Sequence, residues 1–100
     1  MRNGGAGDAE DIWDTIGFLI SSKYRIAALR QLVDNPSTPT SIASRADLQI
    51  THVSRALRAL AARSLVELRV SAETTKGRIY GTTDRGELLW QRIQAAGMLD

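Results

Sequence analysis

Apolar residues recur every three to four positions in five stretches of the chain, which is the spacing of helices that bury one face. The helices are expected at residues 9–20, 23–34, 39–46, 50–63 and 84–96, the last of them starting with a capping box. After residue 63 the period changes, because Val66 to Val70 alternates apolar and charged residues as a half-buried strand does. We therefore predict strands near 66–71 and 78–83. The order of elements predicts a mainly α fold with a small two-stranded β-hairpin.

The stretch from Thr38 to Arg63 reads as two helices joined by the turn Asp47-Leu48-Gln49. Thr38 is placed to cap the first helix, and Pro39 takes its first position, where the missing N–H costs nothing. The second helix has an apolar stripe formed by Val53, Ala56, Leu57 and Leu60. At about 100° per residue, the opposite face carries Thr51, Arg55 and Arg58. This geometry is typical of a protein that reads the major groove of DNA.

Two segments resemble winged helix-turn-helix transcriptional regulators of the MarR-like kind found in archaea and bacteria. LQITHVSRALRALAARSLVEL at 48–68 is similar to their recognition helix and first wing strand, and YGTTDRGELL at 80–89 to the second wing strand and next helix. The resemblance covers roughly residues 20–95. It implies a winged helix-turn-helix whose hairpin is the wing. The organisation expected is a disordered N-terminus at 1–8 and one domain at 9–100, with 22–83 as its core and 9–20 and 84–99 as dimerisation helices.

The first helix is more apolar than its length requires. Either it lies over the core, or it joins the last helix in a dimer contact. We favour the dimer, because a small domain has limited inner surface to cover both apolar flanks. The predicted dimer-interface residues are Ile12, Trp13, Ile16, Leu19, Leu89, Trp90 and Ile93.

Charge is distributed unevenly along the 100 residues, although the net charge is only +2. Residues 1–20 hold one arginine and four acids, whereas residues 45–78 hold seven basic and three acidic residues. Most of the positive charge therefore lies on the helix pair and the hairpin. This is a modest electrostatic footprint for a polyanion.

The composition argues against several classes of function. There is no cysteine, which excludes disulfides and thiolate metal sites and fits a cytoplasmic protein. No apolar run reaches the ~18 residues of a membrane span, and the N-terminus lacks a signal-peptide core. With one histidine and no Gly-rich phosphate loop, we expect no enzyme activity, no cofactor and no metal.

The candidate DNA contacts fall into two groups. Side chains that reach base edges are expected from Gln49, Thr51, His52, Ser54, Arg55 and Arg58. Contacts to the DNA backbone are expected from the start of helix 39–46 and from the hairpin tip, namely Ser37, Thr38, Thr40, Ser41, Thr74, Thr75, Lys76 and Arg78. Each group has a simpler reading, since exposed arginines are often only solvated, hydroxyls cap helices, and basic hairpin tips protect sheet edges.

We expect a sequence-specific regulator that binds double-stranded DNA as a homodimer. Helix 50–63 would enter the major groove and wing 72–78 the neighbouring minor groove or backbone. Two recognition helices about 34 Å apart would read an inverted repeat. The alternatives are a winged-helix protein–protein interaction module and a non-specific chromatin-type DNA-binding protein. The sequence does not indicate whether a small-molecule effector binds.

Overall fold

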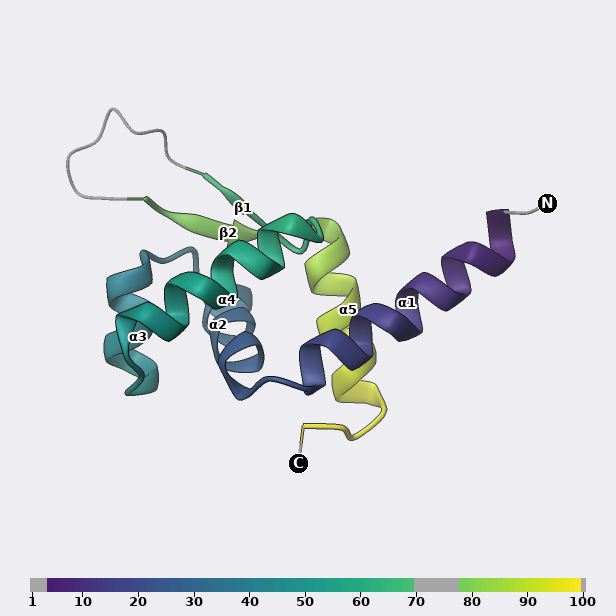
Figure 1. The fold of residues 1–100 in the computed structure, drawn as a ribbon, viewed down its shortest axis with the longest axis horizontal. Helices are drawn as coiled ribbons and strands as arrows, with labels where there is room; N and C mark the ends of the chain where they lie inside the picture. The colour runs from purple at the N-terminus through teal and green to yellow at the C-terminus, as the bar shows by residue number, and fades with distance from the viewer. Residues whose placement is uncertain (1–3, 70–77, 100) are drawn as a thin grey trace.

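The computed structural model describes residues 4–69 and 78–99, with side chains described from residue 12 onward. Its elements follow the order α1 (Gly4–Ile20), α2 (Lys23–Asp34), α3 (Pro39–Ala46), α4 (Ile50–Ala62), β1 (Val66–Leu68), β2 (Tyr80–Thr82) and α5 (Asp84–Ala95). Figure 1 shows α2, α3 and α4 gathered beside the hairpin, with α5 behind α1 on the other side. The predicted fold class, a mainly α winged helix-turn-helix, is confirmed.

Most predicted boundaries agree with the structure within one residue, and the largest difference lies at the start of α1. This helix begins at Gly4, whereas we predicted a start near Ala9 and no regular structure in residues 1–8. Extending an existing helix adds one hydrogen bond per residue fixed, so a formed helix can continue into glycines that would not nucleate one. Residues 1–3 lie outside the described part of the chain.

The helix ends follow the capping chemistry of the sequence. The Ser22 and Thr38 side chains accept hydrogen bonds from the backbone N–H groups of Arg25 and Ser41, which starts α2 and α3. Thr83 caps α5 by accepting from the Gly86 N–H, 3.0 Å away. The expected capping box of Asp84 and Glu87 does not form, because the cap lies one residue earlier, at Thr83, which makes Gly86 the third residue of the helix. Glu87 instead accepts a hydrogen bond from the Thr82 hydroxyl at 2.8 Å.

The two strands are antiparallel, with Val66 opposite Thr82 and Leu68 opposite Tyr80. They are shorter than predicted, although the Arg69 N–H continues the pairing by donating to the Ile79 carbonyl at 2.7 Å. A further bridge was not predicted: Ser37 exchanges two backbone hydrogen bonds with Tyr80, of 3.0 and 2.9 Å. The segment between α2 and α3 is thereby tied to the wing.

One hydrophobic core joins all five helices and the first strand. Its buried members are Ile16, Leu19, Ala28, Leu29, Leu32, Ile42, Ala43, Val53, Ala56, Leu57, Leu60, Leu65, Val66, Leu89, Trp90 and Ile93. Both α1 and α5 therefore contribute to the same core as the predicted central unit at 22–83. At roughly 25 cal/mol per Å² of buried apolar surface, this packing is the main stabilising term.

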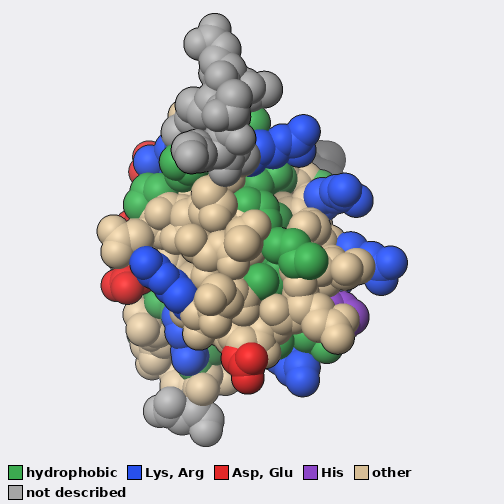
Figure 2. All heavy atoms as spheres, turned by 90° about the vertical axis from the view of Figure 1, so that its left-hand side faces the viewer, with side chains coloured by type: hydrophobic (Ala, Val, Ile, Leu, Met, Phe, Trp, Pro, Cys, Tyr) green, Lys and Arg blue, Asp and Glu red, His purple; other side chains and the backbone are tan. Residues whose placement is uncertain are grey.

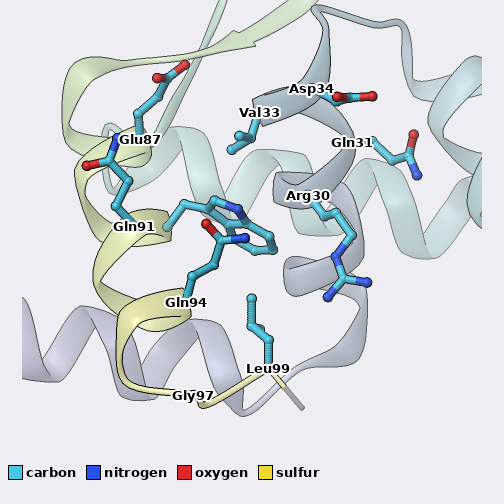
Figure 3. Close-up of a pocket in the computed structure, with 10 residues that line it drawn as sticks. Arg30, Gln31, Val33, Asp34, Glu87, Gln91, Gln94, Gly97 and Leu99 are labelled. Atoms are coloured by element: carbon cyan, nitrogen blue, oxygen red, sulfur yellow. The ribbon is translucent and has the colours of Figure 1, made fainter.

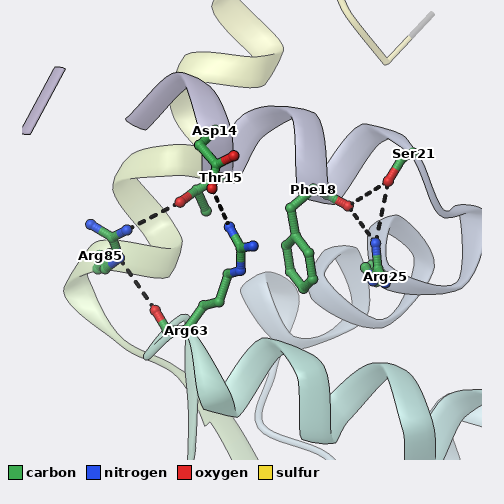
Figure 4. A network of polar contacts seen from close by, with 7 residues as sticks. All are labelled: Asp14, Thr15, Phe18, Ser21, Arg25, Arg63 and Arg85. Carbon is green, nitrogen blue, oxygen red and sulfur yellow. Dashed lines mark hydrogen bonds and ion pairs between the residues drawn. The ribbon is translucent and has the colours of Figure 1, made fainter. Parts of the chain in front are cut away.

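Polar contacts fix the second half of α1 against the rest of the molecule. Figure 4 shows the Phe18 ring between the guanidinium groups of Arg25 and Arg63, which lie 4.0 and 4.1 Å from its centroid. Arg63 also pairs with Asp14 at 3.0 Å, and Arg85 donates to the Thr15 hydroxyl at 3.2 Å. These contacts connect α1 to the end of α4 and the start of α5, so α1 is held in one orientation relative to α4.

Candidate nucleic-acid interface

The turn between α3 and α4 sets the angle at which α4 is presented. Asp47 takes the left-handed conformation with φ 58°, and the Leu48 N–H donates to the Ala43 carbonyl at 2.9 Å. An aspartate tolerates this conformation better than most side chains do. Gln49 then precedes α4 without forming a side-chain cap. The first turn of α4 thus leaves backbone N–H groups without a capping side chain.

The packing of α4 agrees with the apolar stripe read from the sequence. Val53, Leu57 and Leu60 are at most 1% exposed, and Ala56 is also buried. Thr51, Arg55 and Arg58 are exposed on the other side of the helix. The described chain therefore leaves the arginine face of α4 open.

The two arginines of this face have no hydrogen-bond or ion-pair partner among residues 4–69 and 78–99, whereas Arg63 and Arg69 each pair with an acid. Figure 2 shows Lys and Arg side chains along one edge of the molecule, with the single histidine, His52, among them. Unpaired guanidinium groups on an exposed helix face have all five donors available for a ligand. Guanine O6 and N7 or phosphate oxygens are suitable acceptors.

His52 lies differently from the other predicted base-reading residues. Its ring stacks on that of Tyr24 in α2, with centroids 4.4 Å apart and planes 14° from parallel. His52 therefore links the start of α4 to α2, and its side chain is half-buried. Ser54 is also half-buried, whereas Gln49 is exposed. No sequence signal pointed to this stack, because Tyr24 is 28 positions from His52 along the chain.

The predicted backbone contacts at the start of α3 differ in their availability. Ser37 is only 7% exposed, and its hydroxyl donates to the Asn35 carbonyl at 3.1 Å. This burial removes Ser37 as a phosphate contact and corrects the prediction. The Thr38 hydroxyl caps α3, Ser41 is half-buried, and Thr40 is exposed. Thr40 is the most open hydroxyl of this group.

Part of the predicted wing contact can be located. Arg78 is exposed at the start of the second half of the hairpin, while Thr74, Thr75 and Lys76 lie outside the described residues. Arg69, which the sequence pattern did not single out, directly follows the other strand, β1. Its Nε is 3.3 Å from a Glu67 carboxylate oxygen, and its guanidinium donates to the Thr82 carbonyl. Arg69 is thus held by the sheet, and Arg78 is the free cation of the described wing.

The predicted dimer interface needs correction. Five of its residues are covered by the chain itself, with exposed fractions of 5% or less: Ile16, Leu19, Leu89, Trp90 and Ile93. Ile12 is half-buried against the same core. The helical spacing identified apolar faces correctly, but it cannot tell a face that meets the protein's own core from one that meets a partner. Trp13 is the exception, since 62% of its surface is exposed.

A hollow on the described surface lies away from α4. It has a volume of about 710 Å³ between α2 and α5, and Figure 3 shows side chains from both helices around it. Its lining is mostly polar, with Arg30, Gln31, Gln91 and Gln94 at its walls. None of the residues around it comes from α3, α4 or the strands. This hollow is therefore separate from the arginine face.

The described ranges contain neither a membrane-spanning helix nor a metal centre. Within 4–69 and 78–99, no helix is both long and apolar enough to cross a bilayer. No group of three or more histidine or acidic side chains in these ranges is arranged to hold a metal ion.

A helix pair whose second helix presents an open arginine face, followed by a hairpin and a closing helix, defines a winged helix-turn-helix protein. The chain belongs to the family described as the HVO_A0261 N-terminal domain, whose model matches residues 13–97. No curated protein sequence matches it.

Solved structures confirm the fold. The chain is similar to the homodimeric winged helix-turn-helix DNA-binding domain of Mb0332 from Mycobacterium bovis, with a TM-score of 0.73 and 20% identity over 96% of this chain and 87% of that one. It is also similar to MepR of S. aureus in a DNA complex, with a TM-score of 0.66 and 20% identity over 90% and 76% of the two chains. For ZitR from Lactococcus lactis the TM-score is 0.67, with 18% identity over 74% of this chain and only 51% of ZitR. The MarR-like fold expected from the sequence is thus present, and at these identities the likeness concerns the fold alone.

Proposed function

We propose that this protein is a transcriptional regulator that binds double-stranded DNA sequence-specifically as a homodimer. The observation that carries the proposal is the open face of α4, where Arg55 and Arg58 are exposed and unpaired within the described chain. On a winged helix-turn-helix this is the face that enters the major groove. Arginine forms bidentate hydrogen bonds with guanine there, each worth about 1–3 kcal/mol of discrimination.

Groups around α4 are suited to hold the DNA backbone. The exposed Thr40 lies in the first turn of α3, where the helix dipole favours a phosphate. Pro39 has no N–H and the Ser41 N–H is capped by Thr38, so the Thr40 hydroxyl and N–H are the donors at this end of the helix. Arg78 belongs to the wing, and we propose that Lys76 and the neighbouring threonines extend that contact toward the minor groove. Such contacts position the protein without reading sequence, and they make its affinity depend on salt.

The proposed homodimer uses the apolar surface that the core leaves uncovered. Trp13 on α1, Leu88 on α5 and Met98 beyond it are 62%, 48% and 40% exposed. We propose that a second copy covers them, so that the two recognition helices are related by a two-fold axis and read an inverted repeat. The M. bovis domain of the same fold is homodimeric, which supports a homodimer here. In this role the protein acts in the cytoplasm, on DNA, and has no catalytic activity.

Selection from a pool of random duplexes tests the proposal directly. We expect the unmodified protein to enrich an inverted repeat. Arg55→Ala should lose preference at one base pair per half-site, with a free-energy loss of about 1–3 kcal/mol. The matched control is Arg92→Ala, which removes another exposed arginine, on α5, and should enrich the same motif.

The alternative functions give different results in the same experiment. A non-specific chromatin-type protein would retain DNA but enrich no motif, so its affinities for selected and random duplexes would be nearly equal. A protein–protein interaction module would retain no DNA even at low salt. The unpaired arginines favour DNA binding over the interaction module, and enrichment of a motif separates specific from non-specific binding.

A further inference from the structure

A small hollow lies between α2 and α4, beside the arginine face. Its volume is about 230 Å³, and its lining includes Tyr24 and Arg25 from α2 and His52 and Arg55 from α4. The charged side chains in this lining are all basic, and no acid contributes to it. A concave surface lined by charges of one sign concentrates a ligand of the opposite sign, so this hollow is suited to an anion.

The His52 ring in the wall of the hollow is held in place, and its charged neighbours are cations. It stacks on Tyr24, and the Lys23 ammonium lies 5.3 Å from the centroid of the Tyr24 ring. Arg25 and Arg55 line the same hollow. Among the described residues, no carboxylate forms an ion pair with His52. The described chain therefore offers no anionic partner to a protonated imidazole, so such a partner has to come from a ligand.

Helix geometry places His52 beside the arginine face and not within it. At about 100° per residue, His52 lies about 60° from Arg55 around α4, on the flank next to α2. When the arginines point to base edges, a side chain on this flank points to the wall of the groove, which the DNA backbone forms. Figure 2 shows the histidine at the surface, with Lys and Arg side chains above and below it.

We propose that this hollow binds a phosphate of the DNA backbone, with His52 and Arg25 as donors, and that His52 takes up a proton when DNA binds. Arg25 uses Nη1 for its bonds to Phe18 and Ser21, so its other guanidinium nitrogen groups can donate to a ligand. A phosphate favours the charged form of a histidine that it contacts. This inference rests on the proposed function and deepens it, because it adds a contact from α2 and moves His52 from base reading to the backbone.

The pH dependence of DNA affinity tests the contact, because His52 is the only histidine of the chain. Once selection has given a duplex, its affinity is measured by fluorescence anisotropy from about pH 8 to about pH 5.5, the range in which histidine changes its charge. For each protomer bound, the affinity of the unmodified protein should rise about 5-fold toward acid pH, the effect of two unit charges about 4 Å apart in water. His52→Gln keeps a hydrogen-bond donor but cannot change its charge, so this rise should disappear.

Two further variants show whether the effect belongs to the hollow. Tyr24→Leu removes the stack but keeps an apolar side chain, so the His52 ring is no longer held and the rise should become smaller. The matched control is Arg92→Ala, which removes an exposed arginine on α5 and should keep the full rise. Thermal unfolding by circular dichroism shows whether each variant is folded at the pH of the assay. A full-size rise in folded Tyr24→Leu would contradict the positioning of His52 by the stack.

Inorganic phosphate, added without DNA, separates a contact to the duplex from a site for free anions. We expect it to leave the NMR signals of the His52 ring unchanged. If it shifts them while the affinity for DNA does not depend on pH, the hollow binds a free anion and the inference is overturned.

Two other results would overturn the inference and leave the proposed function intact: an affinity for the selected duplex that is the same at all pH values, or a rise of equal size in His52→Gln. If no motif is enriched at all, the proposed function itself fails, and the inference fails with it.

Discussion

Gly86 occupies a position where any side chain would collide with the backbone, and its replacement by alanine tests how α5 is attached. A Cβ atom built on Gly86 would lie 2.1 Å from the Leu65 carbonyl oxygen and 3.0 Å from its carbonyl carbon. These are backbone atoms, so the contact can be relieved only by moving the start of α5 away from the segment that joins α4 to β1. Glycine is needed here for close approach of two backbones.

The free-energy change follows from the contacts that such a shift disturbs. Overpacking of a tight site costs about 1–3 kcal/mol. Displacement of α5 also weakens the Thr83 cap, whose hydroxyl accepts from the Gly86 N–H at 3.0 Å and donates to the Ser64 carbonyl at 2.6 Å, for about 1 kcal/mol more. The helix propensity of alanine returns up to about 1 kcal/mol. We expect Gly86→Ala to lose about 1–3 kcal/mol of stability, or roughly 5–20 °C in Tm.

Gly17 provides the matched control. It is also a helical glycine, but it is exposed, and a Cβ atom built on it would have nothing within 4 Å. Gly17→Ala should therefore gain up to about 1 kcal/mol from helix propensity. Urea and thermal unfolding followed by circular dichroism, at equal protein concentrations, would measure both changes. A Gly86→Ala variant as stable as the unmodified protein, or a shift of both variants in the same direction, would show that Gly86 is not needed for close approach of the two backbones.

Four further substitutions test other contacts of the molecule. Arg58→Ala should lower affinity for the selected duplex by about 1–3 kcal/mol in anisotropy titrations, and unchanged affinity would remove it from the interface. Lys76→Ala should weaken binding to all duplexes alike and flatten the slope of log affinity against log salt by about one unit, whereas a change confined to one sequence would contradict its assignment to the backbone. Trp13→Ser should shift the protein toward monomer in analytical ultracentrifugation, and an unaltered dimer would exclude α1 from the contact. Asp14→Asn removes the exposed ion pair with Arg63, so the free energy of unfolding should change by less than about 1 kcal/mol. A larger loss would show that this ion pair stabilises the fold more than exposed ion pairs usually do.

The fold could be predicted from the sequence because its signals are local. Helical spacing located α2, α3 and α4 within one residue, and Thr38, Pro39 and Asp47 marked the ends of α3 correctly. The direction of the apolar stripe also determined which side of α4 is open. These features depend on residues a few positions apart, where periodicity and capping preferences act.

The features that the sequence did not reveal depend on contacts between distant residues. Ser37 was expected to be a free hydroxyl, but its pairing with Tyr80 buries it. The stack of His52 on Tyr24 and the packing of Phe18 between two arginines also join separate helices. The apolar faces of α1 and α5 were found from their spacing, but only the packing showed that the core covers most of them.

If the face of α4 carrying Arg55 and Arg58 binds DNA, its backbone amides should respond when a selected duplex is added, and NMR chemical shifts would record the response residue by residue. We predict that the largest shift changes fall on the first three turns of α4, with smaller changes at the start of α3 and on the wing. Changes that instead concentrate on α5 and the hollow between α2 and α5, with α4 unaffected, would contradict the assignment of this face.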